Sequence, residues 1–143
     1  MNLSIRVDSG EVAHASTWLG ETGAARGIPA EPLSRLDLCV TEVVANVIDH
    51  GGAGTASSPI YLRLDVHRSA DGGEASVIVS AAGARYDPLT VPSRPRPRTL
   101  SEAQPGGLGL LILRQFADAL DYSYSEGQNH LTIHVRWNEE DAP

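Results

Sequence analysis

The chain contains no lysine, and all eleven of its basic residues are arginines. P-loop enzymes and Schiff-base enzymes both depend on a lysine, so the sequence excludes these two kinds of site. The eighteen acidic residues leave a net charge of −7. An acidic chain without a basic cluster lacks the positive surface that nucleic acid requires, and we expect no direct nucleic-acid partner.

Cysteine and long apolar runs are also scarce. Cys39 is the only cysteine, which excludes an internal disulfide and a four-thiolate metal site. We interpret Cys39 as a small buried residue. No run of about 18 apolar residues is present, so we expect no membrane span. The N-terminus has no apolar signal core, and together these absences predict a cytoplasmic protein.

Hydrophobic periodicity predicts a mixture of helices and strands in a single domain covering 1–143. The expected strands are 3–7, 61–67, 75–80, 121–125 and 130–137, and the expected helices are 11–25, 33–51 and 110–119. Asp8 or Ser9 is expected to cap the first helix. Two adjacent hairpins imply a mixed, mostly antiparallel sheet, and the three helices can cover one face of it. We therefore predict an α/β (α+β) two-layer sandwich.

The helix expected at 33–51 has two unlike faces. One broad arc is apolar, and the opposite arc carries Glu42, Asn46, Asp49 and His50, because spacings of three, four and seven or eight residues repeat along one side of a helix. A solvated face usually carries longer charged side chains. This set of carboxylates, amide and imidazole can bind a hard cation or transfer a proton.

A glycine-rich junction, Gly106-Gly107-Leu108-Gly109, precedes the helix expected at 110–119. Backbone N–H groups at such a helix start can bind phosphate, although a hinge or a simple cap is an alternative. Mg²⁺ prefers oxygen ligands such as the Asn46 amide oxygen, and a carboxylate one turn away, Glu42, can act as a general base. Together the two features suit a nucleoside triphosphate.

The segment 88–105 separates these features. It holds five of the nine prolines and the three arginines Arg94, Arg96 and Arg98, with little apolar content. Such a segment cannot bury enough surface to order itself firmly. A loop of this length is usually functional or mobile, and we expect it to be mobile.

Three motifs, taken in order, resemble those of one ATPase superfamily. The stretch EVVANVIDHG from Glu42 resembles the N-box of the superfamily that contains gyrase, histidine kinases and MutL. Gly83 with Tyr86-Asp87-Pro88 resembles the G1 box of anti-sigma-factor serine kinases, and 106–109 resembles their G2 box. Segment 88–105 then corresponds to the ATP lid. The order, the spacing and the short chain favour that kinase family, with its histidine-kinase-like ATPase fold.

The resemblance implies an anti-sigma factor that is also a serine/threonine protein kinase. Such a protein sequesters an alternative sigma factor and uses Mg-ATP to phosphorylate a small antagonist protein, which switches the partner that is held. Family members are often homodimers, and the N-terminal strand is an available edge for pairing.

The resemblance also implies roles for single residues. Glu42 would be the general base and Asn46 the Mg²⁺ ligand. The other expected cofactor-binding residues are Asp49, His50, Gly83, Asp87, Gly106, Gly107, Leu108 and Gly109, with Gly83 bordering the adenine pocket and Gly106, Gly107 and Gly109 facing the phosphates. Asp87 is expected to shape the start of the lid, and His50 has an equally good structural interpretation. One lid arginine could contact the γ-phosphate, or all three could be solvated.

One position departs from the family pattern. Ala81 stands where the family has the acid that accepts a hydrogen bond from the adenine amino group. Loss of such a bond costs about 1.5–3 kcal/mol, or roughly 10- to 150-fold in affinity. ATP could still bind weakly through its phosphates and Mg²⁺, or the pocket could be vestigial in a nucleotide-independent regulatory module. A generic ATP-binding switch subunit is a third interpretation.

Overall fold

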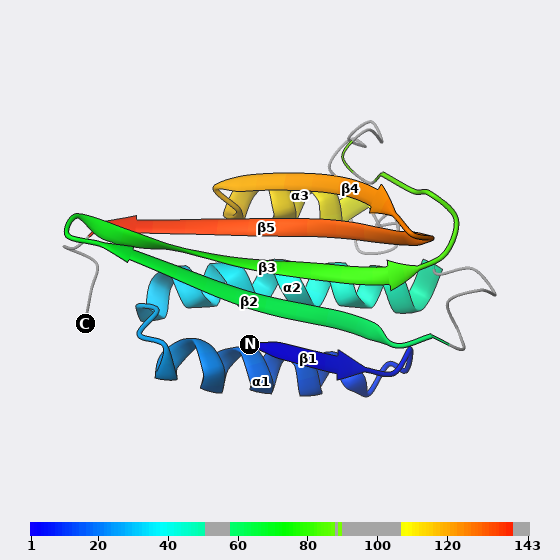
Figure 1. The fold of residues 1–143 in the computed structure, drawn as a ribbon, viewed down its shortest axis with the longest axis horizontal. Coiled ribbons are helices and arrows are strands. Elements are labelled where there is room, and N and C mark those ends of the chain that lie inside the picture. Colours follow the sequence, from blue (N-terminus) through cyan, green and yellow to red (C-terminus); the bar gives the residue numbers. More distant parts are fainter. Residues whose placement is uncertain (51–57, 88, 90–106, 139–143) are drawn as a thin grey trace.

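The computed structural model describes residues 1–50, 58–87, 89 and 107–138 (Figure 1). In chain order the elements are β1 (Asn2–Ile5), α1 (Glu11–Ala25), α2 (Ala30–His50), β2 (Ile60–Ser69), β3 (Gly72–Ala82), α3 (Gly107–Phe116), β4 (Ala119–Ser125) and β5 (Gln128–Asn138). This order confirms the predicted one. The expected helix stop at 51–52 and, apart from residue 89, the loop 88–105 lie outside the described residues.

The five strands form one sheet in the order β1-β2-β3-β5-β4. Each of the four pairings is antiparallel, so the described sheet contains no parallel pair. The reason is that β1 and β3 run in one direction with β2 between them, and β3 and β4 run in one direction with β5 between them (Figure 1). The predicted antiparallel pairing is confirmed, but the described sheet is entirely antiparallel where a mixed sheet was expected.

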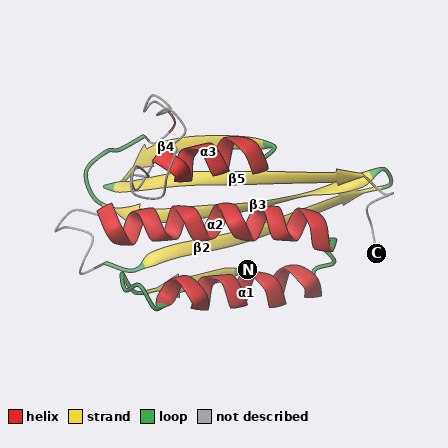
Figure 2. Ribbon diagram, turned by 180° about the vertical axis from the view of Figure 1, so that it is seen from behind, coloured by secondary structure: helices red, strands yellow, loops and turns green. Residues whose placement is uncertain are grey.

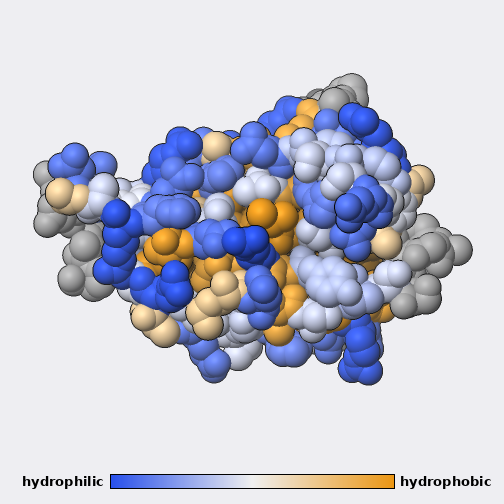
Figure 3. Space-filling view, in the orientation of Figure 1, coloured by the Kyte–Doolittle hydropathy of each residue, from blue (hydrophilic) through white to orange (hydrophobic). Residues whose placement is uncertain are grey.

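The helices all lie on one face of this sheet (Figure 2). The strand side chains that face them form the core with the inner sides of α1, α2 and α3, and the predicted inner row Leu131, Ile133, Val135 and Trp137 belongs to it. On the other face, hydrophilic residues surround a few apolar ones (Figure 3). The fold is thus the expected two-layer sandwich. In the part of the chain that is described, no helix has the length and apolar character needed to cross a membrane.

The start of α1 differs from the expectation. Its N-cap is Gly10, and no side chain caps the helix. Asp8 instead accepts the Gly10 N–H through Oδ1 at 3.0 Å and the Glu11 N–H through its carbonyl at 2.9 Å. The Asp8 carboxylate therefore stabilises the turn before the helix, which places it too early to serve as a cap.

The bounds of α2 and α3 also differ. The first α2 bond runs from the Leu33 N–H to the Pro29 carbonyl, so α2 begins at Ala30, three residues before the predicted start. Pro32 lies in the first turn, where its missing N–H costs nothing. The α3 helix covers 107–116 in place of 110–119. It ends early because Ala119 pairs with His134 in the sheet.

Gly27 ends α1 with a φ of +83°, and a Cβ there would lie 1.3 Å from Arg68 Nη2, which donates to the Arg26 carbonyl. We expect Gly27→Ala to lower the free energy of unfolding by about 2 kcal/mol, because the backbone conformation is costly for alanine and the Arg68 bond is displaced. Urea unfolding measures the change. Gly20→Ala is the control, since nothing lies within 4 Å of that Cβ. Equal effects of the two substitutions would contradict the prediction.

Candidate functional site

One end of the molecule gathers the segments that carry the three motifs. The C-terminal end of α2, the end of β3, the start of β5 and the start of α3 all lie at this end (Figure 1). The view from behind shows the same arrangement, with α2 and α3 side by side and running in opposite directions (Figure 2). The fold therefore brings the N-box, G1 and G2 segments together, although about sixty residues separate the first from the last.

Arg35 shows which side of α2 faces α3. Its guanidinium donates to the Phe116 carbonyl at the end of α3, at 2.9 Å. At about 100° per residue, Glu42 and Asn46 point within about 20° of the direction of Arg35. The two candidate site residues thus lie on the side of α2 that faces α3.

Asn46 and the start of α3 also lie at similar positions along the axes of the two helices. Asn46 lies eleven residues beyond Arg35, about 16 Å along α2, and Gly107 lies nine residues before Phe116, about 14 Å along α3. Because the helices are antiparallel, Asn46 is level with the start of α3. Glu42 lies one turn further from that end. The polar side of α2 therefore faces the helix start that carries the glycines.

Glu42 and Asn46 are both half-buried, and neither side chain makes a hydrogen bond to another described residue. Asp49 is exposed, and the side chain of His50 is outside the described part. No group of three or more His, Cys, Asp and Glu residues that could hold a metal occurs among the described residues. One amide oxygen and a nearby carboxylate suit Mg²⁺, which retains several waters and takes its other ligands from phosphates. The residues present fit a magnesium nucleotide in this respect.

The glycines at the start of α3 have a helical backbone. Gly107, Leu108 and Gly109 form its first turn, whose N–H groups have no partner within the helix. Gly106 lies outside the described residues. A helix start with two glycines offers unpaired donors and a partial positive charge without Cβ atoms in the way. From the sequence, these glycines were expected in a loop before the helix. The structure instead places Gly107 and Gly109 in the first turn of α3.

The third motif follows β3. Ala81 is 6% exposed and faces the helices, and Gly83 has a φ of +146°, a conformation that favours glycine. Asp87 Oδ1 accepts the Leu89 N–H at 2.9 Å, and Arg114 of α3 donates to the Leu89 carbonyl at 3.4 Å. Asp87 therefore stabilises the turn that leads into segment 88–105.

The predictions missed Asn129, which was assigned to a turn and in fact lies in β5. It pairs with Ala81 on one side and Tyr124 on the other, so it faces the same side of the sheet as Ala81. Its side chain donates to the Ala84 carbonyl and accepts from the Tyr86 N–H and the Tyr122 hydroxyl. A polar residue two positions before the buried row that starts at Leu131 was the available signal.

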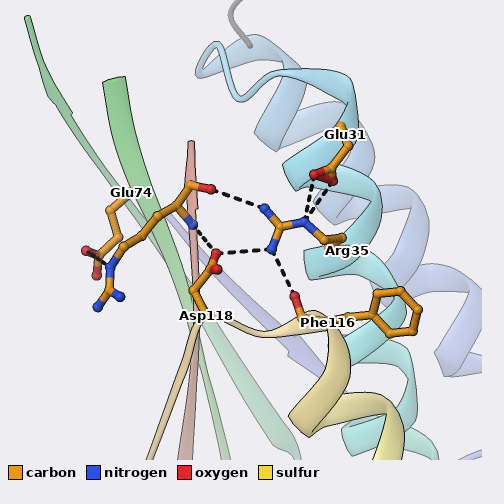
Figure 4. A network of polar contacts seen from close by, with 6 residues as sticks. Glu31, Arg35, Glu74, Phe116 and Asp118 are labelled. Atoms are coloured by element: carbon orange, nitrogen blue, oxygen red, sulfur yellow. Dashed lines mark hydrogen bonds and ion pairs between the residues drawn. The ribbon is translucent and has the colours of Figure 1, made fainter. Parts of the chain in front are cut away.

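The predictions also missed Arg35, which connects α2, the end of α3 and β5 (Figure 4). Besides Phe116, it contacts the Glu31 carboxylate at 2.7 Å, Asp118 Oδ2 at 3.0 Å and the Arg136 carbonyl at 3.1 Å. Burial acts to lower the pKa of Arg35, but Glu31 and Asp118 outweigh it and raise that pKa. Its position seven residues before Glu42, on the same side of α2, was the only sequence signal.

Cys39 lies on the buried side of α2 and is fully buried. Burial raises the pKa of the Cys39 thiol to about 11, and the Glu42 carboxylate adds to the rise. The thiol is therefore protonated at neutral pH and is not a nucleophile. The prediction of a small buried residue is confirmed.

Comparison with known proteins agrees with this geometry. Residues 5–135 match the family model described as a histidine kinase-like ATPase domain. The chain is 34% identical over 131 residues to the serine/threonine-protein kinase BtrW of Bordetella bronchiseptica, covering 92% of this chain and 89% of that protein. The motifs, the two-layer fold and the matched range agree, and the chain belongs to the histidine kinase-like ATPase domain family.

Proposed function

We propose that the protein is an ATP-dependent serine/threonine protein kinase that also acts as an anti-sigma factor. The observation that carries the proposal is the position of Glu42 and Asn46, which face α3 near the glycine-rich start of that helix. The similarity to a protein named as a serine/threonine-protein kinase supports the kinase part. The sigma factor and the small antagonist protein follow from the sequence resemblance described above.

In this proposal each group has one task. Asn46 holds Mg²⁺ through its amide oxygen, and the first-turn N–H groups of α3 hold the phosphates. The bound Mg-ATP supplies the phosphoryl group. Glu42 accepts the proton of the attacking Ser or Thr hydroxyl. The hydroxyl oxygen forms a bond to the γ-phosphorus as the bond between that phosphorus and ADP breaks. Asp49, His50, Gly83, Asp87 and Gly106 remain proposed contributors to the cofactor site.

A second candidate function is favoured by Ala81. This side chain is buried and apolar at the position that the family uses for an acid, and the neighbouring Asn129 amide is already hydrogen-bonded to residues 84 and 86. A nucleotide-independent module that binds the same partners would need no adenine acid. Homodimer formation through the edge strand β1 is compatible with either function.

Calorimetric titration with Mg-ATP separates the two candidates. We expect saturable heat at submillimolar to millimolar ATP, because phosphate and Mg²⁺ contacts remain although the adenine acid is absent. Incubation with Mg-ATP and a candidate small antagonist protein should then transfer phosphate to a Ser or Thr of that protein. No heat and no transfer at millimolar ATP, with partner binding retained, would contradict the kinase and support the binding module.

A further inference from the structure

Residues 83–86 form a short loop between the end of β3 and Asp87. Ala84, Arg85 and Tyr86 are exposed, and Tyr86 is 62% exposed. No apolar side chain of these residues joins the core cluster. The conformation of this loop therefore depends on polar contacts.

Those contacts come from the β4–β5 hairpin. Asn129 Nδ2 donates to the Ala84 carbonyl at 3.0 Å, and the Tyr86 N–H donates to Asn129 Oδ1 at 2.9 Å. The Tyr124 hydroxyl donates to the Gly83 carbonyl at 2.9 Å, and the Gly83 N–H donates to the Gly127 carbonyl at 3.2 Å. Among the described residues, Asn129 is the one side chain that holds the loop at two points.

A carboxamide is the group that this position needs. The Ala84 carbonyl requires a donor and the Tyr86 N–H requires an acceptor, and asparagine supplies both on one short side chain. Aspartate would lose the donor, and leucine would lose both. The Tyr122 hydroxyl also donates to Oδ1 and orients the amide, which sets which end of it faces Ala84.

The loop connects two parts of the candidate site. At one end it continues β3, two residues after Ala81. At the other it leads to Leu89, whose carbonyl accepts a hydrogen bond from Arg114 of α3. The described residues 83–87 and 89 thus contact the β4–β5 hairpin at one end and α3 at the other. A displaced loop would change how these residues are placed between the end of β3 and α3.

We propose that Asn129 is a positioning residue for nucleotide binding: it fixes residues 83–86 against the β4–β5 hairpin and so sets the affinity for Mg-ATP. The inference rests on the proposed function, since it requires that the wild-type protein bind Mg-ATP. Asn129 is not itself a catalytic residue in this assignment. Its effect should therefore fall on binding, with the rate at saturating nucleotide retained.

The test compares wild type, Asn129→Leu, Asn129→Asp and Tyr124→Phe. We expect Asn129→Leu to raise the Kd for Mg-ATP and the KM for ATP about tenfold, with kcat within about twofold, because two loop hydrogen bonds are lost. Asn129→Asp and Tyr124→Phe should show smaller increases, since each keeps part of the anchoring. Ser123→Ala, an exposed change between Tyr122 and Tyr124, is the matched control and should leave the Kd unchanged.

A second measurement needs no nucleotide. Hydrogen exchange of the Tyr86 amide should accelerate about tenfold or more in Asn129→Leu, because its acceptor is gone. The melting temperature should fall by only about 2 °C, since the loop buries no apolar side chain. If Asn129→Leu does not fold, Asn129→Ala carries both measurements, since it also removes the donor and the acceptor.

The outcomes are distinguishable. Wild-type binding with an unchanged Kd in Asn129→Leu would overturn the inference and leave the proposed function intact. A loss of affinity that only parallels a large fall in melting temperature would also overturn it, since the role would then be structural. No Mg-ATP binding by the wild type would refute the proposed kinase and this inference together, and Tyr86 exchange would still report whether Asn129 fixes the loop.

Discussion

Replacing Glu42 with glutamine is expected to slow phosphate transfer to the antagonist protein at least about 100-fold, while the Kd for Mg-ATP stays within about threefold. Glutamine keeps the size and a hydrogen-bonding oxygen of the side chain but cannot accept the hydroxyl proton. Because the Glu42 side chain makes no hydrogen bond to another described residue, the substitution removes no side-chain hydrogen bond from the described part of the fold. Radiolabel transfer at saturating Mg-ATP measures the rate, and calorimetry measures the Kd.

The matched control for Glu42→Gln is the same change at Glu21, an exposed residue of α1 far along the chain from the site. It removes the same charge and should leave transfer unchanged. Transfer by Glu42→Gln at the wild-type rate would contradict the assignment of Glu42 as the base. Loss of transfer together with loss of Mg-ATP binding would point instead to a role in holding the nucleotide.

The second large effect is expected at Arg35. Arg35→Met should lower the free energy of unfolding by about 3 kcal/mol, because two backbone carbonyls and two carboxylates lose a charged donor at a partly buried position. For a chain of this size, the corresponding fall in melting temperature is about 10 °C. Methionine keeps most of the aliphatic volume, so the change reports the polar contacts. Urea unfolding and thermal melting measure both quantities.

Arg63→Met is the control for Arg35→Met. Arg63 is mostly exposed on β2, and its ion pair with Asp65 at 3.2 Å lies at the surface. Exposed pairs of this kind contribute only about 0–1 kcal/mol, so we expect a small effect. Similar losses from the two substitutions would show that the network around Arg35 adds nothing beyond a surface charge.

Arg35 also links stability to the site. Arg35 lies seven residues before Glu42 and hydrogen-bonds the end of α3 to α2. These contacts help to set the distance between the polar side of α2 and the glycine-rich start of α3. The Asp118 carboxylate, which accepts from Arg35, also accepts a hydrogen bond from the Arg136 N–H at 2.6 Å. Burial acts to raise the pKa of Asp118, but the Arg136 N–H and the Arg35 guanidinium outweigh it and lower that pKa. Arg35 and Asp118 are therefore both charged at neutral pH.

Much of the fold was predictable because it depends on local patterns. The bounds of α1, the period-two strands β2 and β5, and the hairpin between β4 and β5 follow from apolar spacing and turn residues. The family motifs placed Glu42, Asn46 and the glycines before any geometry was known. The departure at Ala81 was also visible without a structure, since it needs only the position relative to Gly83.

The contacts that join distant segments were not predictable in this way. Arg35 meets Phe116 across 81 residues and Asn129 meets Ala84 across 45, and no local pattern distinguishes either residue from a solvated one. The end of α3 before Ala119 was decided by pairing between β4 and β5. Thus the sequence by itself determined the elements, the family and the candidate chemistry. Only the tertiary structure decided which side chains hold the site together, because those contacts exist only once the helices and the sheet are packed.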